Sequence, residues 1–402
     1  MEQLIKEHLS SFNMDVRKSG DARFMDQKCT PDVISIMADC VLNLVGDDKS
    51  RTFTVNDIWS SQYFIKTVKM IFKKPSADNH TVIHEYDKFI QQPLRMLAYA
   101  NVLGMVKCGR VNLYCINKYD ILEFISLSER NASRFLYKYI ERVLIDSGIY
   151  HYFEDYKNAY LDNKLDDKSF NSLKEKFQRF IVGHTKINGI VEVNRIFPKV
   201  LNVYAFHNGL LGTIKGRLSK HEIYYDDLMY NRRNWRDIGK KEKNTSRQEA
   251  KAQCSLDLEP DDTLYKEYLV QRAINQIKRL YAESEIKDQW NVGEATQVHH
   301  IFPRYEFPQL AHRLENLIKL TPTQHYTKAH PRNKTKDINV AYQLTCLLAK
   351  SHSIEKSLRR NEPYYRKESF LYCVNTGLSL ELKFDITFGE LKMKLAVLYN
   401  KI

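Results

Sequence analysis

The sequence predicts an α+β protein of several domains, and three observations lead to that prediction. The chain has 402 residues, more than one hydrophobic core usually organises, so two or three domains are expected. Most segments repeat apolar residues at helical spacing and are interrupted by a few short apolar runs of strand type. One stretch near the C-terminal end, residues 297–331, has the pattern strand, loop, strand, helix.

Changes in composition along the chain divide it into three expected regions. Residues 1–158 hold a patterned module of helices and a hairpin at about 30–126. Residues 159–260 follow a charged polar segment and are expected to form a helical, basic region. Residues 261–402 hold a long helix, the strand–loop–strand–helix stretch and further helices. We therefore expect a middle region between two more sharply patterned ones.

The charge balance points to a polyanionic partner. The chain has 62 Lys and Arg against 49 Asp and Glu, a formal net charge of +13 at pH 7, and nucleic acid is the commonest polyanion. A membrane is not expected as a partner because no apolar run approaches the length of a bilayer span. No signal peptide is visible, and the seven scattered Cys contain no CxxC pair. These features favour the cytoplasm.

The N-terminal module has recognisable element boundaries. Thr30 is expected to cap a helix that has Pro31 at its first position. Asn56 is expected to cap a second helix, and Gly104 to stop a third in which Pro93 starts or kinks a segment. The expected helices are 31–45, 56–71, 86–103 and 119–126, with a strand at 52–55 and a hairpin at 106–116.

This order of elements resembles a winged helix. The resemblance implies that residues 86–95 approach the major groove of duplex DNA, where four side chains can reach base edges or phosphates: Lys88, Gln91, Gln92 and Arg95. Arg110 at the tip of the wing would contact phosphate or the minor groove. A winged helix used only for structure or protein docking is the alternative.

A basic and aromatic run in the middle region is a second candidate contact with DNA. Arg232, Arg233, Trp235 and Arg236 suit a phosphate track with stacking. A solvated loop is the alternative. Asp26, Lys28 and Asp32 suggest a PD-(D/E)xK nuclease, but no acidic-x-Lys pair follows on a later strand. Asp32 is instead interpreted as the charge of a helix N-terminus.

The stretch 297–331 carries the clearest chemical pattern. His299 and His300 are adjacent in a short apolar strand that ends at Pro303. Asn316 precedes a second strand, 317–320, and His325 lies in a helix that Thr321 or Thr323 can cap. Most single histidines are neither ligands nor bases. Neighbours on a strand face opposite ways, so one of this pair can face a metal while the other faces a water.

The stretch resembles the HNH motif, the ββα-metal fold of colicin-type DNases, homing endonucleases and some restriction enzymes. HHIFP matches the first strand of the family, ENLIKLTP the Asn-Leu strand and QHYTKAHP the closing helix. The resemblance implies that His299 and His325 are metal ligands and that His300 is the general base. Asn316, which ties the loop to the strands in the family, is grouped with His300 as an expected catalytic residue. His330 is a further candidate ligand. Some family members place that residue one position earlier, where this chain has Ala329.

The resemblance implies a metal-dependent phosphodiesterase acting on double-stranded DNA and leaving 5′-phosphate and 3′-hydroxyl ends. A separate DNA reader joined to an HNH module resembles type II restriction endonucleases, including those that cut beside their site. The expected cofactor is Mg²⁺, with Mn²⁺ or another transition metal as alternatives. A homodimer would serve double-strand cleavage. Two alternatives stay open: a nuclease directed at modified DNA, and a DNA-binding regulator with an inactive HNH fold.

Overall fold

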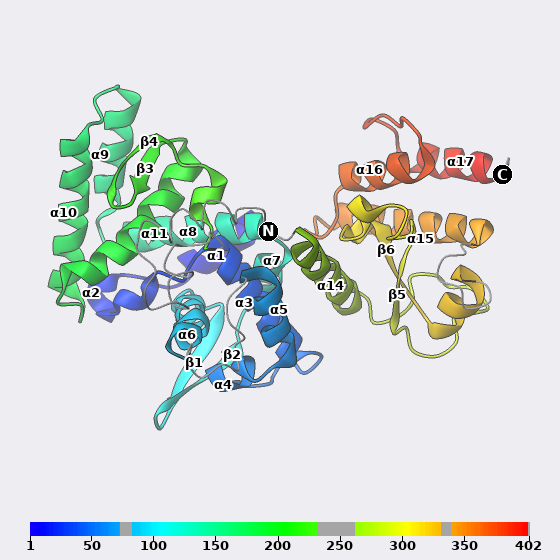
Figure 1. Cartoon of the computed structure of the whole chain (residues 1–402), viewed down its shortest axis with the longest axis horizontal. Helices are drawn as coiled ribbons and strands as arrows, with labels where there is room; N and C mark the ends of the chain where they lie inside the picture. Colours follow the sequence, from blue (N-terminus) through cyan, green and yellow to red (C-terminus); the bar gives the residue numbers. More distant parts are fainter. Residues whose placement is uncertain (73–82, 231–261, 331–338, 401–402) are drawn as a thin grey trace, which may run out of the picture. The chain divides into compact units, whose positions relative to one another are not determined.

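The computed structural model describes residues 1–72, 83–230, 262–330 and 339–400. The chain is mixed α and β and mostly helical, and the strands of the described part form two-stranded antiparallel sheets (Figure 1). It divides into two compact units, Met1–Glu259 and Pro260–Ile402. This division is coarser than the three regions expected from the sequence. No described helix combines the length and apolarity needed to cross a bilayer.

The core of the first unit is organised around α3 (Pro31–Val45), which is buried along almost its whole length. A helix that is apolar on nearly every side has to be covered on every side. α3 packs against α7 (Tyr119–Leu127) and α8 (Glu129–Asp146). Pro31 begins the helix, as expected, but the side chain of Thr30 at the N-cap makes no capping hydrogen bond.

The patterned module contains α4 (Val55–Trp59), α5 (Gln62–Phe72), α6 (Ile83–Tyr99) and the strands β1 (Leu103–Cys108) and β2 (Val111–Ile116). The helix expected at 56–71 was wrong in two respects. It is interrupted near Ser60, and its cap is Thr54, which forms a capping box with Asp57. The expected strand at 52–55 is reduced to Phe53, whose backbone pairs with Tyr114 through bonds of 2.9 and 2.8 Å.

The end of α6 also differs from the expectation. The helix includes Pro93 and ends at Tyr99, because Asn101 takes a left-handed φ of 51° and the Val102 amide bonds back to the Leu97 carbonyl at 3.0 Å. Gly104 therefore does not stop the helix but lies inside β1. The hairpin turns tightly, with Cys108 paired to Val111 and a left-handed Gly109 between them.

The remaining elements complete the first unit. α8 is followed by the long helices α10 (Asp167–His184) and α11 (Ile190–Asn208), which pack together. The small hairpin β3–β4 packs against α11. The other elements are α1 (Glu2–Ser10), α2 (Val16–Ser19), α9 (Tyr150–Leu161), β3 (Leu211–Ile214) and β4 (Arg217–Glu222).

The second unit is built on the hairpin-like pair β5 (Gln297–His300) and β6 (Leu317–Leu320), with His299 opposite Ile318. α14 (Asp262–Leu280) packs against both strands, and a short π-helix, η6 (Gln324–Ala329), follows β6. α15 (Val340–Arg359), α16 (Lys367–Leu378) and α17 (Phe388–Tyr399) complete the unit. The apolar side chains of β6 pack in one core with Leu347 and Ile354 of α15.

A buried ion pair fixes β6 to α15. The Lys350 ammonium lies 2.9 and 2.8 Å from the two carboxylate oxygens of Glu285, and both side chains have 0% exposure. Burial lowers the pKa of Lys350, and the Glu285 charge opposes that shift. Glu285 also accepts the backbone amide of Lys319 at 3.0 Å. Removing one partner of such a pair costs about 3–5 kcal/mol because the other charge stays buried.

Candidate metal centre

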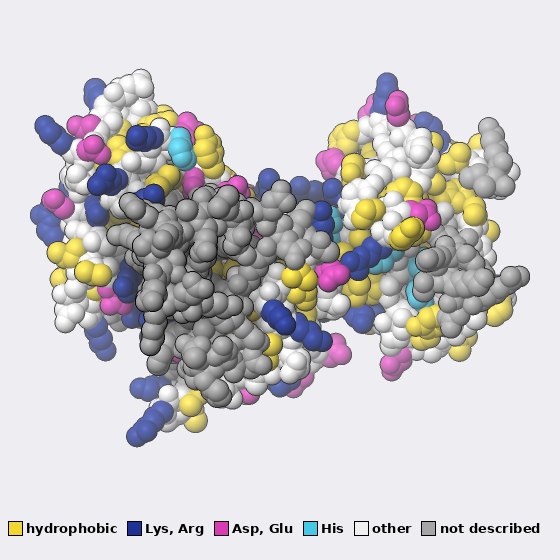
Figure 2. All heavy atoms as spheres, viewed as in Figure 1, with side chains coloured by type: hydrophobic (Ala, Val, Ile, Leu, Met, Phe, Trp, Pro, Cys, Tyr) yellow, Lys and Arg dark blue, Asp and Glu magenta, His cyan; other side chains and the backbone are white. Residues whose placement is uncertain are grey.

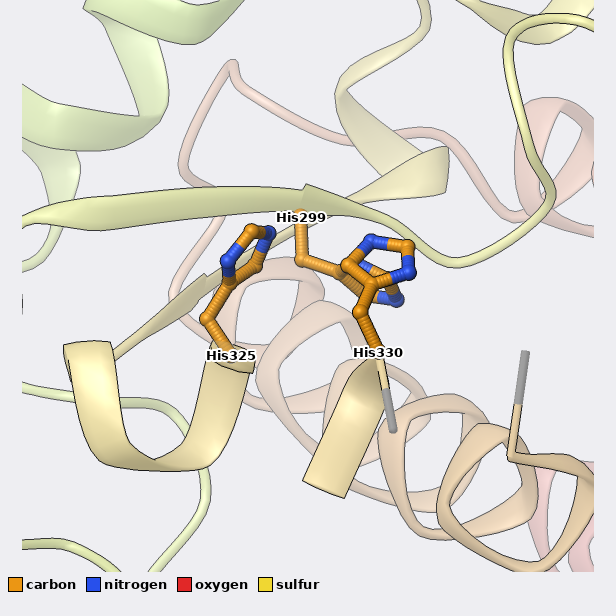
Figure 3. A group of neighbouring side chains, drawn as sticks. All are labelled: His299, His325 and His330. Carbon is orange, nitrogen blue, oxygen red and sulfur yellow. The ribbon is translucent and has the colours of Figure 1, made fainter. Parts of the chain in front are cut away.

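Three histidines from two elements come together in the second unit. His299 extends from β5, His325 belongs to η6, and His330 follows η6 directly (Figure 3). Each ring offers one nitrogen, and these nitrogens all lie within 4.8 Å of one another. The ring centroids are 4.7–5.4 Å apart and the ring planes are steeply inclined to one another. The structure thus gathers the three expected ligands into one cluster.

The π-helical turn explains how residues five positions apart can face one site. The His330 amide bonds to the His325 carbonyl at 3.0 Å, which is the i to i+5 pattern of a π-helix. In an α-helix of 3.6 residues per turn, the residue four positions after His325 would lie on the same face as His325, and that residue is Ala329. The wider π-helical turn places His330 on that face instead.

The environment of the cluster favours the neutral form of two of its imidazoles, those of His299 and His325. His299 is only 3% exposed, and burial, followed by the nearby His330 and His325, holds its pKa well below 6.5. Burial and the neighbouring His330 lower the pKa of His325 to about 4. The Nδ1 atoms of His299 and His325 are buried without a hydrogen-bond partner in the part of the chain that the structure describes. Such nitrogens suit metal coordination, since a metal supplies the partner that a buried polar atom needs.

The donor set indicates which metals fit. Three neutral imidazoles are typical ligands of zinc and other late transition metals, and sites of three His and one water occur in zinc enzymes. Mg²⁺ prefers oxygen ligands. No carboxylate joins this cluster among the described residues. The geometry therefore suits a transition metal better than the Mg²⁺ expected from the resemblance.

His300 is oriented differently from its neighbour. Its Nε2 lies 3.0 Å from the carbonyl oxygen of Ala311. A carbonyl only accepts hydrogen bonds, so Nε2 carries the proton and Nδ1 keeps a lone pair able to accept one. Burial lowers the pKa of His300, the bond to Ala311 opposes this, and the charge of Arg304 lowers it further. The ring is thus held with a lone pair on Nδ1, and its burial favours the neutral form.

Asn316 has the bridging position expected of it. It is fully buried. Its Oδ1 accepts the Phe302 amide at 2.8 Å, and its Nδ2 donates to the carbonyls of Phe302 at 3.0 Å and Leu310 at 3.3 Å. These bonds fix the loop that follows His300 to the start of β6. Asn316 was grouped with the catalytic residues, but these contacts make it a positioning residue.

Gln324, for which the sequence predicted no role at the site, holds the start of η6. Its Oε1 accepts from the Ser284 hydroxyl at 2.6 Å and from the Thr321 amide at 3.0 Å. Its Nε2 donates to the Ile286 carbonyl and to Asp288. Thr321, not Thr323, accepts the Gln324 amide at 3.2 Å. A buried Gln with partners about 40 positions away leaves no local sequence signal.

The expected DNA-contacting residues of α6 differ in how they are placed. Lys88 is exposed and Gln91 is partly exposed. Gln92 accepts the Lys28 amide at 3.0 Å, so its side chain is engaged within the fold. Arg95 is partly exposed and lies 3.8 Å from Asp21.

Arg110 is exposed at the turn of the β1–β2 hairpin, where Figure 2 shows basic side chains beside hydrophobic ones. Also exposed at this end of the hairpin are Met105, Val106, Lys107, Cys108 and Val111. The run Arg232, Arg233, Trp235 and Arg236 lies outside the described residues, so its expected role stays a prediction.

Tyr230, just before that run, was not singled out from the sequence. Its amide donates to the Asp32 carboxylate at 2.9 and 3.1 Å, and its ring packs against Phe72 and Phe89. Lys28 contacts both its hydroxyl and its ring face. Asp32 therefore places a negative charge in the first turn of α3 and also holds the backbone of Tyr230.

Comparisons with protein-family models, with curated proteins and with solved structures find no match to this chain.

Proposed function

We propose that this chain is a metal-dependent endonuclease for double-stranded DNA, with an HNH-type centre in its second unit. The single observation that supports this most is the cluster of His299, His325 and His330 beside a separately oriented His300. Two of the clustered rings present buried nitrogens that have no protein partner in the described chain. In a purely structural His cluster, these unpaired buried nitrogens would lower the stability of the fold, since buried polar atoms are normally hydrogen-bonded.

Each residue then has a distinct task. His299, His325 and His330 would hold a divalent metal, which when bound supplies charge stabilisation at the phosphate. His300 accepts the proton of the attacking water at Nδ1 while the Ala311 carbonyl holds Nε2. The water attacks phosphorus in line, and the products carry 5′-phosphate and 3′-hydroxyl ends. Asn316 keeps the loop after His300 in place.

The metal in this proposal is a transition metal such as Zn²⁺, Mn²⁺, Co²⁺ or Ni²⁺. Three imidazoles, with no carboxylate beside them among the described residues, favour these ions over Mg²⁺. Mg²⁺ would have to exchange water for nitrogen ligands, which it does reluctantly.

We further propose that the first unit reads DNA. Its order of α3, α4–α5, α6 and the β1–β2 hairpin, with Phe53 pairing to Tyr114, supports a winged helix. The net charge of +13 supports a polyanionic partner. The whole chain would then act as a cytoplasmic type II restriction endonuclease. A homodimer would provide one centre for each strand.

Incubation of the full chain with methylated and unmethylated plasmid, with metal added, tests this function when followed by sequencing of the product ends. Cleavage at a repeated site in unmethylated plasmid is the expected result. Cleavage only of methylated plasmid would favour the modification-dependent alternative. Binding without cleavage, with metal bound, would favour the inactive regulator.

A further inference from the structure

The loop between β5 and β6 presents a cation and an aromatic ring to solvent shortly after His300. Tyr305 is 85% exposed, the highest value among the large hydrophobic side chains that the structure describes. The neighbouring Arg304 side chain is 51% exposed. Five residues span at most about 18 Å, so Tyr305 lies within a few nucleotides' length of the His300 ring.

This loop is held rigidly on both sides of the exposed pair. Phe302 is buried, and both its amide and its carbonyl bond to Asn316. Its ring packs against Phe307 and leaves no room for a Cβ at Gly377. The Phe307 amide bonds to the Pro303 carbonyl at 2.8 Å and closes a turn. Residues 304–306 therefore project from a fixed base, so little ordering is needed when they bind.

The charges around this turn leave Arg304 able to exchange partners. Its guanidinium lies 3.7 Å from Glu267, and both side chains are about half exposed, so the pair contributes little. Glu306 is the opposing acid on the same turn and is exposed. Two oxygens of a phosphate would make stronger hydrogen bonds with the Arg304 guanidinium than the distant, exposed Glu267 carboxylate does.

We propose that Arg304 and Tyr305 form a DNA-contact site next to the cleavage centre. Arg304 binds a backbone phosphate adjacent to the cleaved one, and the Tyr305 ring packs on a neighbouring sugar or base. This inference rests on the proposed function and adds residues that position the strand for attack. Arginine offers bidentate donors to phosphate, and an aromatic ring stacks on nucleotides of any sequence.

The test measures DNA affinity and single-turnover cleavage of the full chain, with affinity determined in the presence of a metal chelator. Tyr305→Ala should weaken binding roughly tenfold and slow cleavage, while Tyr305→Phe should behave like the wild type because the ring remains. Arg304→Gln should flatten the dependence of log affinity on log salt by about 0.9. Phe384→Ala removes another exposed aromatic ring of the second unit and should change neither quantity.

Thermal unfolding of each variant checks that the loop changes leave the fold intact. Wild-type affinity and cleavage in both Tyr305→Ala and Arg304→Gln would overturn the inference and leave the proposed nuclease standing. A metal-loaded wild-type chain that binds DNA without cutting it would contradict the proposed nuclease. The DNA affinities of Tyr305→Ala and Arg304→Gln would then still decide the inference. A folded wild-type chain that binds no DNA would overturn both proposals.

Discussion

The backbone amide of His330 donates a hydrogen bond to the carbonyl oxygen of His325 at 3.0 Å. This single bond spans five positions and marks a π-helical turn. Turns of this kind are rare and are frequently found at functional sites. Here the turn places two imidazoles opposite His299, whereas an α-helical turn would have placed Ala329 there.

The first prediction concerns His330 as a ligand. His330→Ala should weaken transition-metal binding by at least ten- to a hundredfold, the scale seen even for groups that only support ligands. Competition with a chromophoric chelator measures this. His352→Ala, which removes an exposed His of α15, is the matched control and should bind metal normally. Unchanged metal affinity in His330→Ala would remove this residue from the site.

The second prediction concerns Asn316. Asn316→Ala leaves the Phe302 amide and carbonyl without their partners, which should lower the free energy of unfolding by about 1–3 kcal/mol. Urea denaturation of the full chain measures this. Cleavage should also fall because the loop after His300 loosens.

Asn375 provides a control with the same kind of bonding. Its side chain bridges the amide and carbonyl of Leu382 in the same unit. Asn375→Ala should cost comparable stability and leave cleavage close to normal. Equal losses of cleavage in both variants would reduce Asn316 to a purely structural residue.

The sequence predicted which histidines lie close together better than it predicted the elements around them. Adjacent histidines on a short strand, an Asn before the next strand and a His on the following helix are local patterns, and the structure places His299 and Asn316 as expected. The π turn could not be predicted, because its hydrogen bonds depend on how Gln324 is anchored by Ser284 and Asp288. Likewise, the interruption near Ser60 and the early end of α6 depend on capping geometry, not on apolar periodicity.

The third prediction concerns pH. The folded pKa values of His299 and His325 lie below the ordinary 6.5, so the unfolded chain takes up these protons first as the pH falls. Their contribution to stability is complete above about pH 6.5 and is lost as the pH falls towards about 4, where His325 itself titrates. Urea midpoints of the metal-free chain at about pH 7 and about pH 5 measure the loss. The loss should be smaller in His325→Gln, and an identical loss in both proteins would contradict the assignment.

The fourth prediction separates the residues of the first unit that face solvent from one that is engaged in the fold. Lys88→Ala and Arg110→Ala should each flatten the log-affinity versus log-salt slope for DNA by about 0.9, because each removes one phosphate contact. Gln92→Ala should instead lower stability, since the Lys28 amide loses its partner. Lys164→Ala, at an exposed lysine between α9 and α10, is the control for charge alone. If Lys164→Ala changes the slope as much as Lys88→Ala and Arg110→Ala do, the slope reports the general attraction of positive charge to DNA and not contacts made by those two residues.

The rate at which His300→Ala cuts plasmid DNA, compared with wild type at saturating metal, tests the central claim most directly. The variant keeps all three clustered histidines, so its metal content and DNA affinity should match those of wild type. Its cleavage should be about a hundred- to ten-thousandfold slower, because the proton acceptor at Nδ1 is gone. Cleavage by the folded, metal-loaded variant at the wild-type rate would contradict the account, and so would a metal-loaded wild-type chain that binds DNA and leaves it uncut.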